Sequence, residues 1–279
     1  MHVTGVLSLK GGVGKTTVVL GLAGSALRAG LRTLVVDLDP QGNATTALEP
    51  EATETTIAQA MERPSAALLA SSIAPSAWGE DLDVLVGSED IERHNHPDPG
   101  SQRLGALARL LGDLPKDDDG ATRTGLAKYD LVLIDCPPSL GQLTRSALVA
   151  VDRAVLVTEP TIFAVSGVQR AFEAVQAERE NNPDLQPLGV LVNKYRARSS
   201  EHEFRLGELR ELFGPLVISG ALPDRSAVQQ AQGAGVSHRW IGTPGAREIA
   251  SQFDSLLGRI VRSRTNRSGR GRARRAPEA

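Results

Sequence analysis

A short segment rich in glycine and lysine, residues 10–17 with the sequence Lys-Gly-Gly-Val-Gly-Lys-Thr-Thr, constrains the chain more than any other feature. It follows the apolar run Val3 to Leu9, which is typical of a buried strand, and it precedes a stretch with apolar residues at helical spacing. Glycines allow backbone N–H groups to turn toward phosphate oxygens, and the positive end of the helix dipole faces the same anion. Strand, loop and helix in this order predict a phosphate-binding loop.

The loop departs from the strict GxxxxGK[ST] pattern, because Leu9 stands where the first glycine is required. An extra lysine, Lys10, instead precedes the glycines. We expect Lys15 to reach the β- and γ-phosphates of a nucleotide and Thr16 to bind Mg²⁺. The predicted ATP-binding residues of this loop are Lys10, Gly11, Gly12, Val13, Gly14, Lys15, Thr16 and Thr17.

Three aspartates, Asp37, Asp39 and Asp135, lie at the ends of predicted strands. Such residues often form turns, but the carboxyl ends of parallel strands converge on one crevice, where a phosphate loop favours a metal-binding role. Asp135 follows Leu-Val-Leu-Ile and has the form of a Walker B carboxylate. We therefore expect Asp135 and Asp37 to join Thr16 around Mg²⁺.

Continuous apolar runs alternate with helical patterns along the chain, which predicts an α/β fold with a mostly parallel, doubly wound sheet and helices on both faces. The further predicted strands are 31–37, 82–86, 129–134, 153–158 and 187–192, with 216–218 as an edge strand. The predicted helices are the one after the phosphate loop, ended by Gly30, then 102–114, 165–181 and an amphipathic helix after Pro244.

Charge is distributed unevenly in the 279 residues, although the net charge is only −2. Residues 262–279 hold seven arginines and one glutamate, so the rest of the chain is acidic. We expect a nucleotide-binding domain over 1–262 and a basic, disordered tail over 263–279 that either contacts polyanions or only aids solubility. A single cysteine, Cys136, and the lack of any long apolar run favour a cytoplasmic protein with no membrane span.

Three motifs together resemble the ParA/Soj ATPases of the wider ParA/MinD group, which have a deviant Walker A motif. The resemblance is highly specific and weaker similarity continues through 159–160, 189–193 and 222–225 to Pro244. The three motifs are Lys10 to Thr17, Val36-Asp37-Leu38-Asp39-Pro40-Gln41-Gly42-Asn43-Ala44-Thr45 and Ile134-Asp135-Cys136-Pro137-Pro138-Ser139-Leu140-Gly141.

The resemblance implies a homodimer that encloses ATP, in which Lys10 crosses to the partner's phosphates and Asp39 positions the attacking water. It also implies an adenine pocket lined by Asn193 and by the loop that contains Pro223 and Arg225. Family members bind DNA nonspecifically as ATP dimers, associate with the nucleoid in that state and are stimulated by a ParB-like partner. The sequence leaves the cargo open between a chromosome, a plasmid and a protein cluster.

DNA contacts are where the chain departs most from the family pattern. Arg198 falls on one DNA-contacting position, but Ala227 replaces a second arginine, and Arg196, Arg225 or the basic tail would have to supply further phosphate contacts. Ser8-Leu9 replaces the usual Asn-Gln before the first lysine.

Two alternative functions are a MinD-like ATPase that cycles on a membrane through its C-terminal helix, and a nucleotide-gated adaptor in which hydrolysis is incidental. The first would require a different sequence after Asp39 and a more lipophilic C-terminal end. His94 and His96 are expected in a surface loop rather than at a metal, and Cys136 is expected to be a small buried residue.

Overall fold

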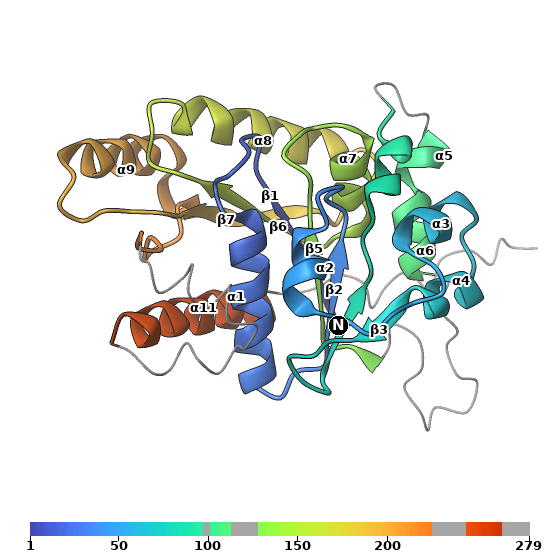
Figure 1. Ribbon diagram of the computed structural model, residues 1–279. Helices are drawn as coiled ribbons and strands as arrows, with labels where there is room; N and C mark the ends of the chain where they lie inside the picture. Colours follow the sequence, from blue (N-terminus) through green and yellow to red (C-terminus); the bar gives the residue numbers. More distant parts are fainter. Residues whose placement is uncertain (97–100, 113–127, 225–243, 264–279) are drawn as a thin grey trace, which may run out of the picture.

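The computed structural model describes residues 1–96, 101–112, 128–224 and 244–263. Seven strands form one sheet in the order β3-β4-β2-β5-β1-β6-β7, parallel throughout except for the β3–β4 pair (Figure 1). The strands are β1 (His2–Leu7), β2 (Thr33–Asp37), β3 (Ile73–Pro75), β4 (Leu82–Leu85), β5 (Leu131–Asp135), β6 (Arg153–Thr158) and β7 (Gln186–Val192).

Helices cover both faces of the sheet, as predicted (Figure 1). One face packs against α1, α2 and α11, and the other against α3, α6, α7, α8 and α9. The helices are α1 (Lys15–Arg28), α2 (Asn43–Leu48), α3 (Ile57–Glu62), α4 (Ala66–Ser71), α5 (Ser101–Leu104), α6 (Ala106–Gly112), α7 (Gln142–Ala150), α8 (Ala164–Glu178), α9 (Ser200–Phe213) and α11 (Pro244–Arg262), with short 3₁₀ segments η1 (Glu89–His94) and η3 (Gly214–Leu216).

The first helix ends as the sequence predicts. Gly30 adopts a left-handed conformation with φ 68°, its N–H bonds the carbonyl of Leu27, and the N–H of Leu31 bonds the carbonyl of Ala26. This pair of bonds is a Schellman cap, which satisfies carbonyls that a helix end would otherwise leave without partners.

The C-terminal helix α11 packs across α1. Its Phe253 ring is buried against Gly21, where any side chain on α1 would overlap the ring, and Ile249 and Ile260 are buried beside it. The apolar stripe of α11 therefore belongs to the core of this domain, which removes the feature that favoured a membrane-binding helix. Apart from Ser263, the predicted tail 263–279 lies outside the described residues.

Several predicted bounds were wrong. The first strand ends at Leu7 rather than Leu9, because Ser8 and Leu9 already leave the sheet to begin the phosphate loop. The predicted helix 102–114 is, as far as Gly112, two short helices separated at Gly105, a residue with low helix propensity, and 113–114 lie outside the described residues. The predicted strand 216–218 is reduced to a single bridge between Val217 and Val190. The elements α2, α3, α4, α7, α9 and β3 were not predicted.

Candidate nucleotide-binding site

The phosphate loop joins β1 to α1 at the carboxyl edge of the sheet. Gly12 and Gly14 adopt left-handed conformations with φ 76° and 91°, which residues with a Cβ atom disfavour. A Cβ on Gly14 would also overlap the side-chain amide of Asn193. These two glycines are therefore required by the backbone path of the loop, as the sequence indicates.

Asn193 ties the end of β7 to this loop. Its Nδ2 donates a hydrogen bond of 2.7 Å to the carbonyl of Val13, and its side chain is buried. Tyr195 pairs with Pro223 through a backbone bridge, which places the predicted Pro223 loop beside the segment that follows Asn193. Arg225 lies outside the described residues.

Thr16, Asp135 and Asp37 come together below the loop. Thr16 Oγ1 donates to Asp135 Oδ2 at 2.6 Å, and Asp37 is the register partner of Asp135 across the adjacent parallel strands β2 and β5. Both aspartates are fully buried, and Asp135 Oδ1 has no hydrogen-bond partner among the described residues. The structure thus brings together the three residues predicted to bind Mg²⁺.

Burial and mutual repulsion raise the pKa values of these acids. Burial, with the charge of Asp37 nearby, raises the pKa of Asp135 to about 8, and burial raises the pKa of Asp37 to about 6. A cation beside two such carboxylates would offset both effects. Mg²⁺ prefers oxygen ligands and is commonly held by one or two carboxylates together with phosphates, so this donor set fits it.

Asp39 lies in the turn that follows β2. It is buried, its Oδ1 accepts a hydrogen bond of 3.1 Å from the N–H of Gln41, and its own N–H donates to Asp37 Oδ1 at 3.3 Å. Asp37 accepts a second bond, of 2.8 Å, from the N–H of Thr45. Asp37 is therefore built into the strand end, whereas Asp39 belongs to the loop that leads into α2.

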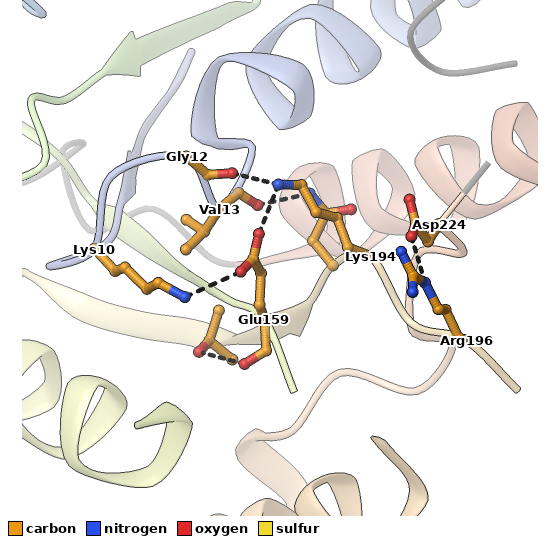
Figure 2. A network of polar contacts seen from close by, with 9 residues as sticks. Lys10, Gly12, Val13, Glu159, Lys194, Arg196 and Asp224 are labelled. Atoms are coloured by element: carbon orange, nitrogen blue, oxygen red, sulfur yellow. Dashed lines mark hydrogen bonds and ion pairs between the residues drawn. The ribbon is translucent and has the colours of Figure 1, made fainter. Parts of the chain in front are cut away.

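The two lysines of the loop have different surroundings. Lys15 is buried at the start of α1. The side chain of Lys10 is 52% exposed, and its ammonium lies 3.2 Å from Glu159 Oε2 (Figure 2). Glu159 also binds Lys194, whose Nζ donates to the carbonyl of Gly12 at 2.5 Å (Figure 2).

Glu159 and Lys194 were not among the predicted site residues. The sequence carries a signal for Glu159, because Glu159-Pro160 falls at the end of a predicted strand, where ligand-binding residues gather. Lys194 directly follows the predicted Asn193 and could have been found in the same way.

The predicted DNA-binding residues lie on the loop between β7 and α9. Arg198 is exposed, while Arg196 forms an ion pair of 2.7 Å with Asp224 (Figure 2). Both line a surface hollow of about 750 Å³ that also includes Arg210 and Pro223. Arg198 is therefore the more available of the two for a phosphate contact.

The other predictions concerned His94, His96 and Cys136. His94 Nε2 lies 2.9 Å from the carbonyl of Ala58, and His96 bonds Gln142 through its backbone N–H. Within the described residues no group of three His, Cys, Asp or Glu side chains is placed around a metal position. Cys136 is buried, as predicted, and burial raises the pKa of its thiol. None of the helices in the described ranges is both long enough and apolar enough to cross a membrane.

Comparison with known proteins agrees with this geometry. Residues 1–187 match the family described as AAA domain. Over 258 residues the chain is 33% identical to the chromosome-partitioning ATPase Soj of Thermus thermophilus, with 90% of this chain and 93% of that protein covered. The chain belongs to the ParA/Soj family. Its members include the chromosome partitioning protein ParA of Caulobacter vibrioides, 32% identical, with 84% of this chain and 85% of that protein covered.

This ParA/Soj chain also superposes on solved structures of proteins with bound nucleotide. Cobyrinic acid a,c-diamide synthase from Mycobacterium smegmatis, with ADP and magnesium bound, superposes with a TM-score of 0.74 at 25% identity, with 95% of this chain and 97% of that chain covered. The fold is shared with the ATP complex of a Cyanothece McdA variant, with a TM-score of 0.76 at 21% identity and coverage of 92% and 96%.

Proposed function

We propose that this ParA/Soj family member is an ATPase that dimerises on Mg²⁺-ATP, hydrolyses it slowly to ADP and phosphate, and uses the cycle to partition DNA or to position another cargo. The observation that carries the proposal is the junction of the phosphate loop with the cluster formed by Thr16 and the buried Asp135 and Asp37. That junction offers main-chain donors and a lysine to phosphates, and oxygen ligands to Mg²⁺.

The chain's own residues divide the work of phosphoryl transfer, which needs positioning and charge neutralisation more than covalent chemistry. Lys15 and the loop amides bind the phosphates of ATP, and Thr16, Asp135 and Asp37 would hold the metal. Mg²⁺, when bound, neutralises charge on the phosphates. Asp39 orients the attacking water, since it occupies a loop beside the metal-binding carboxylates rather than a strand. Asn193, Pro223 and Arg225 line the adenine pocket.

Lys10 completes the site of a second copy. Its side chain is half exposed at the mouth of the loop, so it can reach phosphates outside its own chain. A lysine supplied in trans makes hydrolysis depend on dimerisation. The ATP-bound dimer is therefore the state that acts on the cargo.

In this proposal the ATP-bound dimer binds DNA without sequence preference, so the bound nucleotide determines where the protein is located. Arg198, assisted by Arg196 and by the basic tail, contacts DNA phosphates, which carry no sequence information. Named relatives, including Soj and ParA, are chromosome-partitioning proteins. By the same likeness we propose a ParB-like activating partner and a cytoplasmic protein that joins the nucleoid when ATP is bound.

Turnover and oligomeric state, measured on the same preparation, test the function. We expect Mg²⁺-dependent release of phosphate from ATP, a dimer with a slowly hydrolysed ATP analogue and a monomer with ADP, and faster turnover when DNA is added. If the ATP dimer forms but DNA does not change the rate of turnover, the alternative function as a nucleotide-gated adaptor would be favoured. A lack of any ATP-dependent dimer would contradict the proposed cycle.

A further inference from the structure

Two lysine side chains from distant parts of the chain share one carboxylate at the mouth of the phosphate loop. Lys10 Nζ lies 3.2 Å from Glu159 Oε2, and Lys194 Nζ lies 2.6 Å from Glu159 Oε1 (Figure 2). The lysine side chains are 52% and 45% exposed, whereas that of Glu159 is only 16% exposed. The carboxylate is thus the most buried member of the cluster, and each lysine binds one of its oxygens.

Sheet topology brings the three residues together. Lys10 follows β1, Glu159 follows β6 and Lys194 follows β7, and these three strands are neighbours in the sheet. Lys194 adopts a left-handed backbone conformation with φ 55°, which side chains with a Cβ atom disfavour. Backbone strain of this kind persists where the surroundings over-determine it, and it gathers at functional sites.

Lys194 also fastens the carboxylate to the phosphate loop. Its Nζ donates to the carbonyl of Gly12 at 2.5 Å while it binds Glu159. The neighbouring residue, Asn193, holds the next carbonyl of the loop, that of Val13. Lys10 is therefore pinned in cis by a carboxylate that is itself held against the loop.

Charge favours this arrangement until a stronger anion arrives. Burial opposes ionisation of Glu159, but hydrogen bonds from Lys194 and Lys10 outweigh it and hold the pKa of Glu159 below its usual range. The cluster contains two cations and one anion, so it keeps a net positive charge beside the loop. A triphosphate carries more negative charge than one carboxylate and would compete for the same ammonium groups.

We propose that Glu159 is a positioning residue that retains Lys10 in cis while no triphosphate is in reach, and that it releases Lys10 to the phosphates of a second copy of this chain. The inference rests on the proposed function, in which Lys10 acts in trans, because it names Glu159 as the partner of Lys10 before the dimer forms. Lys194 keeps Glu159 aligned on the loop in the resting state. Dimerisation then requires the exchange of a carboxylate for phosphate at Lys10.

Glu159→Gln tests the exchange, because it removes the charge and leaves the shape. With Mg²⁺ and a slowly hydrolysed ATP analogue, sedimentation should give a dimer dissociation constant about fivefold lower than that of the parent, since a partly exposed ion pair contributes up to about that factor. Glu159→Asp should return it toward the parent value. Glu201→Gln, which breaks the Arg205–Glu201 ion pair on α9, should leave it unchanged. An unchanged or higher dissociation constant for Glu159→Gln would overturn the proposal.

A second measurement uses nucleotide-free protein and does not require a dimer. Brief acetylation with acetic anhydride, followed by peptide mass spectrometry, should label Lys10 several-fold faster in Glu159→Gln than in the parent. Lys128, paired with Asp83 elsewhere, serves as the internal reference. Equal labelling of Lys10 would overturn the proposal. If Lys10 is labelled faster in Glu159→Gln but neither protein dimerises on ATP, the contact between Lys10 and Glu159 is supported. The proposed function is then contradicted.

Discussion

The hydroxyl of Thr16 donates a hydrogen bond of 2.6 Å to Asp135 Oδ2, so the first turn of α1 is fastened to the end of β5. The other oxygen, Asp135 Oδ1, is buried and has no hydrogen-bond partner among the described residues. A buried polar atom without a partner destabilises the fold, and a carboxylate oxygen in this position beside a phosphate loop is suited to bind a cation. Here the ligand that fits is Mg²⁺.

Replacing Asp135 by Asn should weaken Mg²⁺-dependent nucleotide binding by roughly tenfold or more, because the metal loses a charged oxygen ligand. Calorimetric titration of ADP or ATP with and without Mg²⁺ measures the change. The control is Asp130→Asn, which directly precedes the first residue of β5 and should bind nucleotide with the same Mg²⁺ dependence as the parent. Equal Mg²⁺ dependence in Asp135→Asn and the parent would remove this residue from the metal site.

Asp39→Ala should bind ATP and dimerise but lose about a hundredfold or more in turnover, equivalent to roughly 2.7 kcal/mol of transition-state stabilisation. Asp37→Ala is the matched comparison. Because Asp37 is buried in the strand end beside Asp135, its loss should weaken nucleotide binding itself. Single-turnover hydrolysis and ATP affinity measured on both variants separate the roles. If Asp37→Ala alone binds ATP tightly without turnover, the two roles are reversed.

Lys10→Ala should retain ATP as a monomer, since Lys15 and the loop amides remain, and should lose the ATP-dependent dimer and turnover. Size-exclusion chromatography with and without a slowly hydrolysed analogue measures this. Lys128→Ala removes another lysine from a 2.7 Å ion pair, far from the loop in sequence, and should dimerise normally. Normal dimerisation of Lys10→Ala would make this lysine a turn residue only.

DNA binding by the ATP-bound protein should be independent of sequence and should fall steeply between roughly 50 and 200 mM salt. Each lost phosphate contact lowers the log–log salt slope by about 0.9, so Arg198→Ala should flatten it by about that amount and deletion of 263–279 by more. Arg63→Ala, at the end of α3, is the control. A slope unchanged by the deletion would exclude the tail from the interface.

The contribution of Glu159 to stability should depend on pH. Its pKa is lower in the folded chain than in the unfolded one, so its ion pairs stabilise the fold above the ordinary glutamate range, and this contribution is lost as the pH falls through the folded value. Glu159→Gln should thus unfold about 0.5–1 kcal/mol more easily at pH 7, with the difference shrinking below about pH 4.5. Urea titrations across this range measure it, and a difference that persists at low pH would contradict it.

Local patterns predicted the parts of the site that are contiguous in sequence. The phosphate loop and Asp135 each follow an apolar strand, so their place at a shared edge of the sheet could be inferred from the sequence. The contacts of Glu159 could not, because they join residues 149 positions apart in the case of Lys10. The break at Gly105 and the single bridge at Val217 depend on packing that apolar periodicity does not encode.

The register that pairs Asp37 with Asp135 places these two residues on paired strands, unlike the rest of the site. The hydrogen bonds between β2 and β5 fix the backbones of these two residues relative to each other, so a change in their spacing would require a change in strand register. Lys10 and Asp39 instead lie on loops, where no strand pairing fixes their positions. If the proposed roles hold, substitutions in these loops should alter the rate of the cycle, whereas substitutions at the two strand ends should alter the affinity for Mg²⁺.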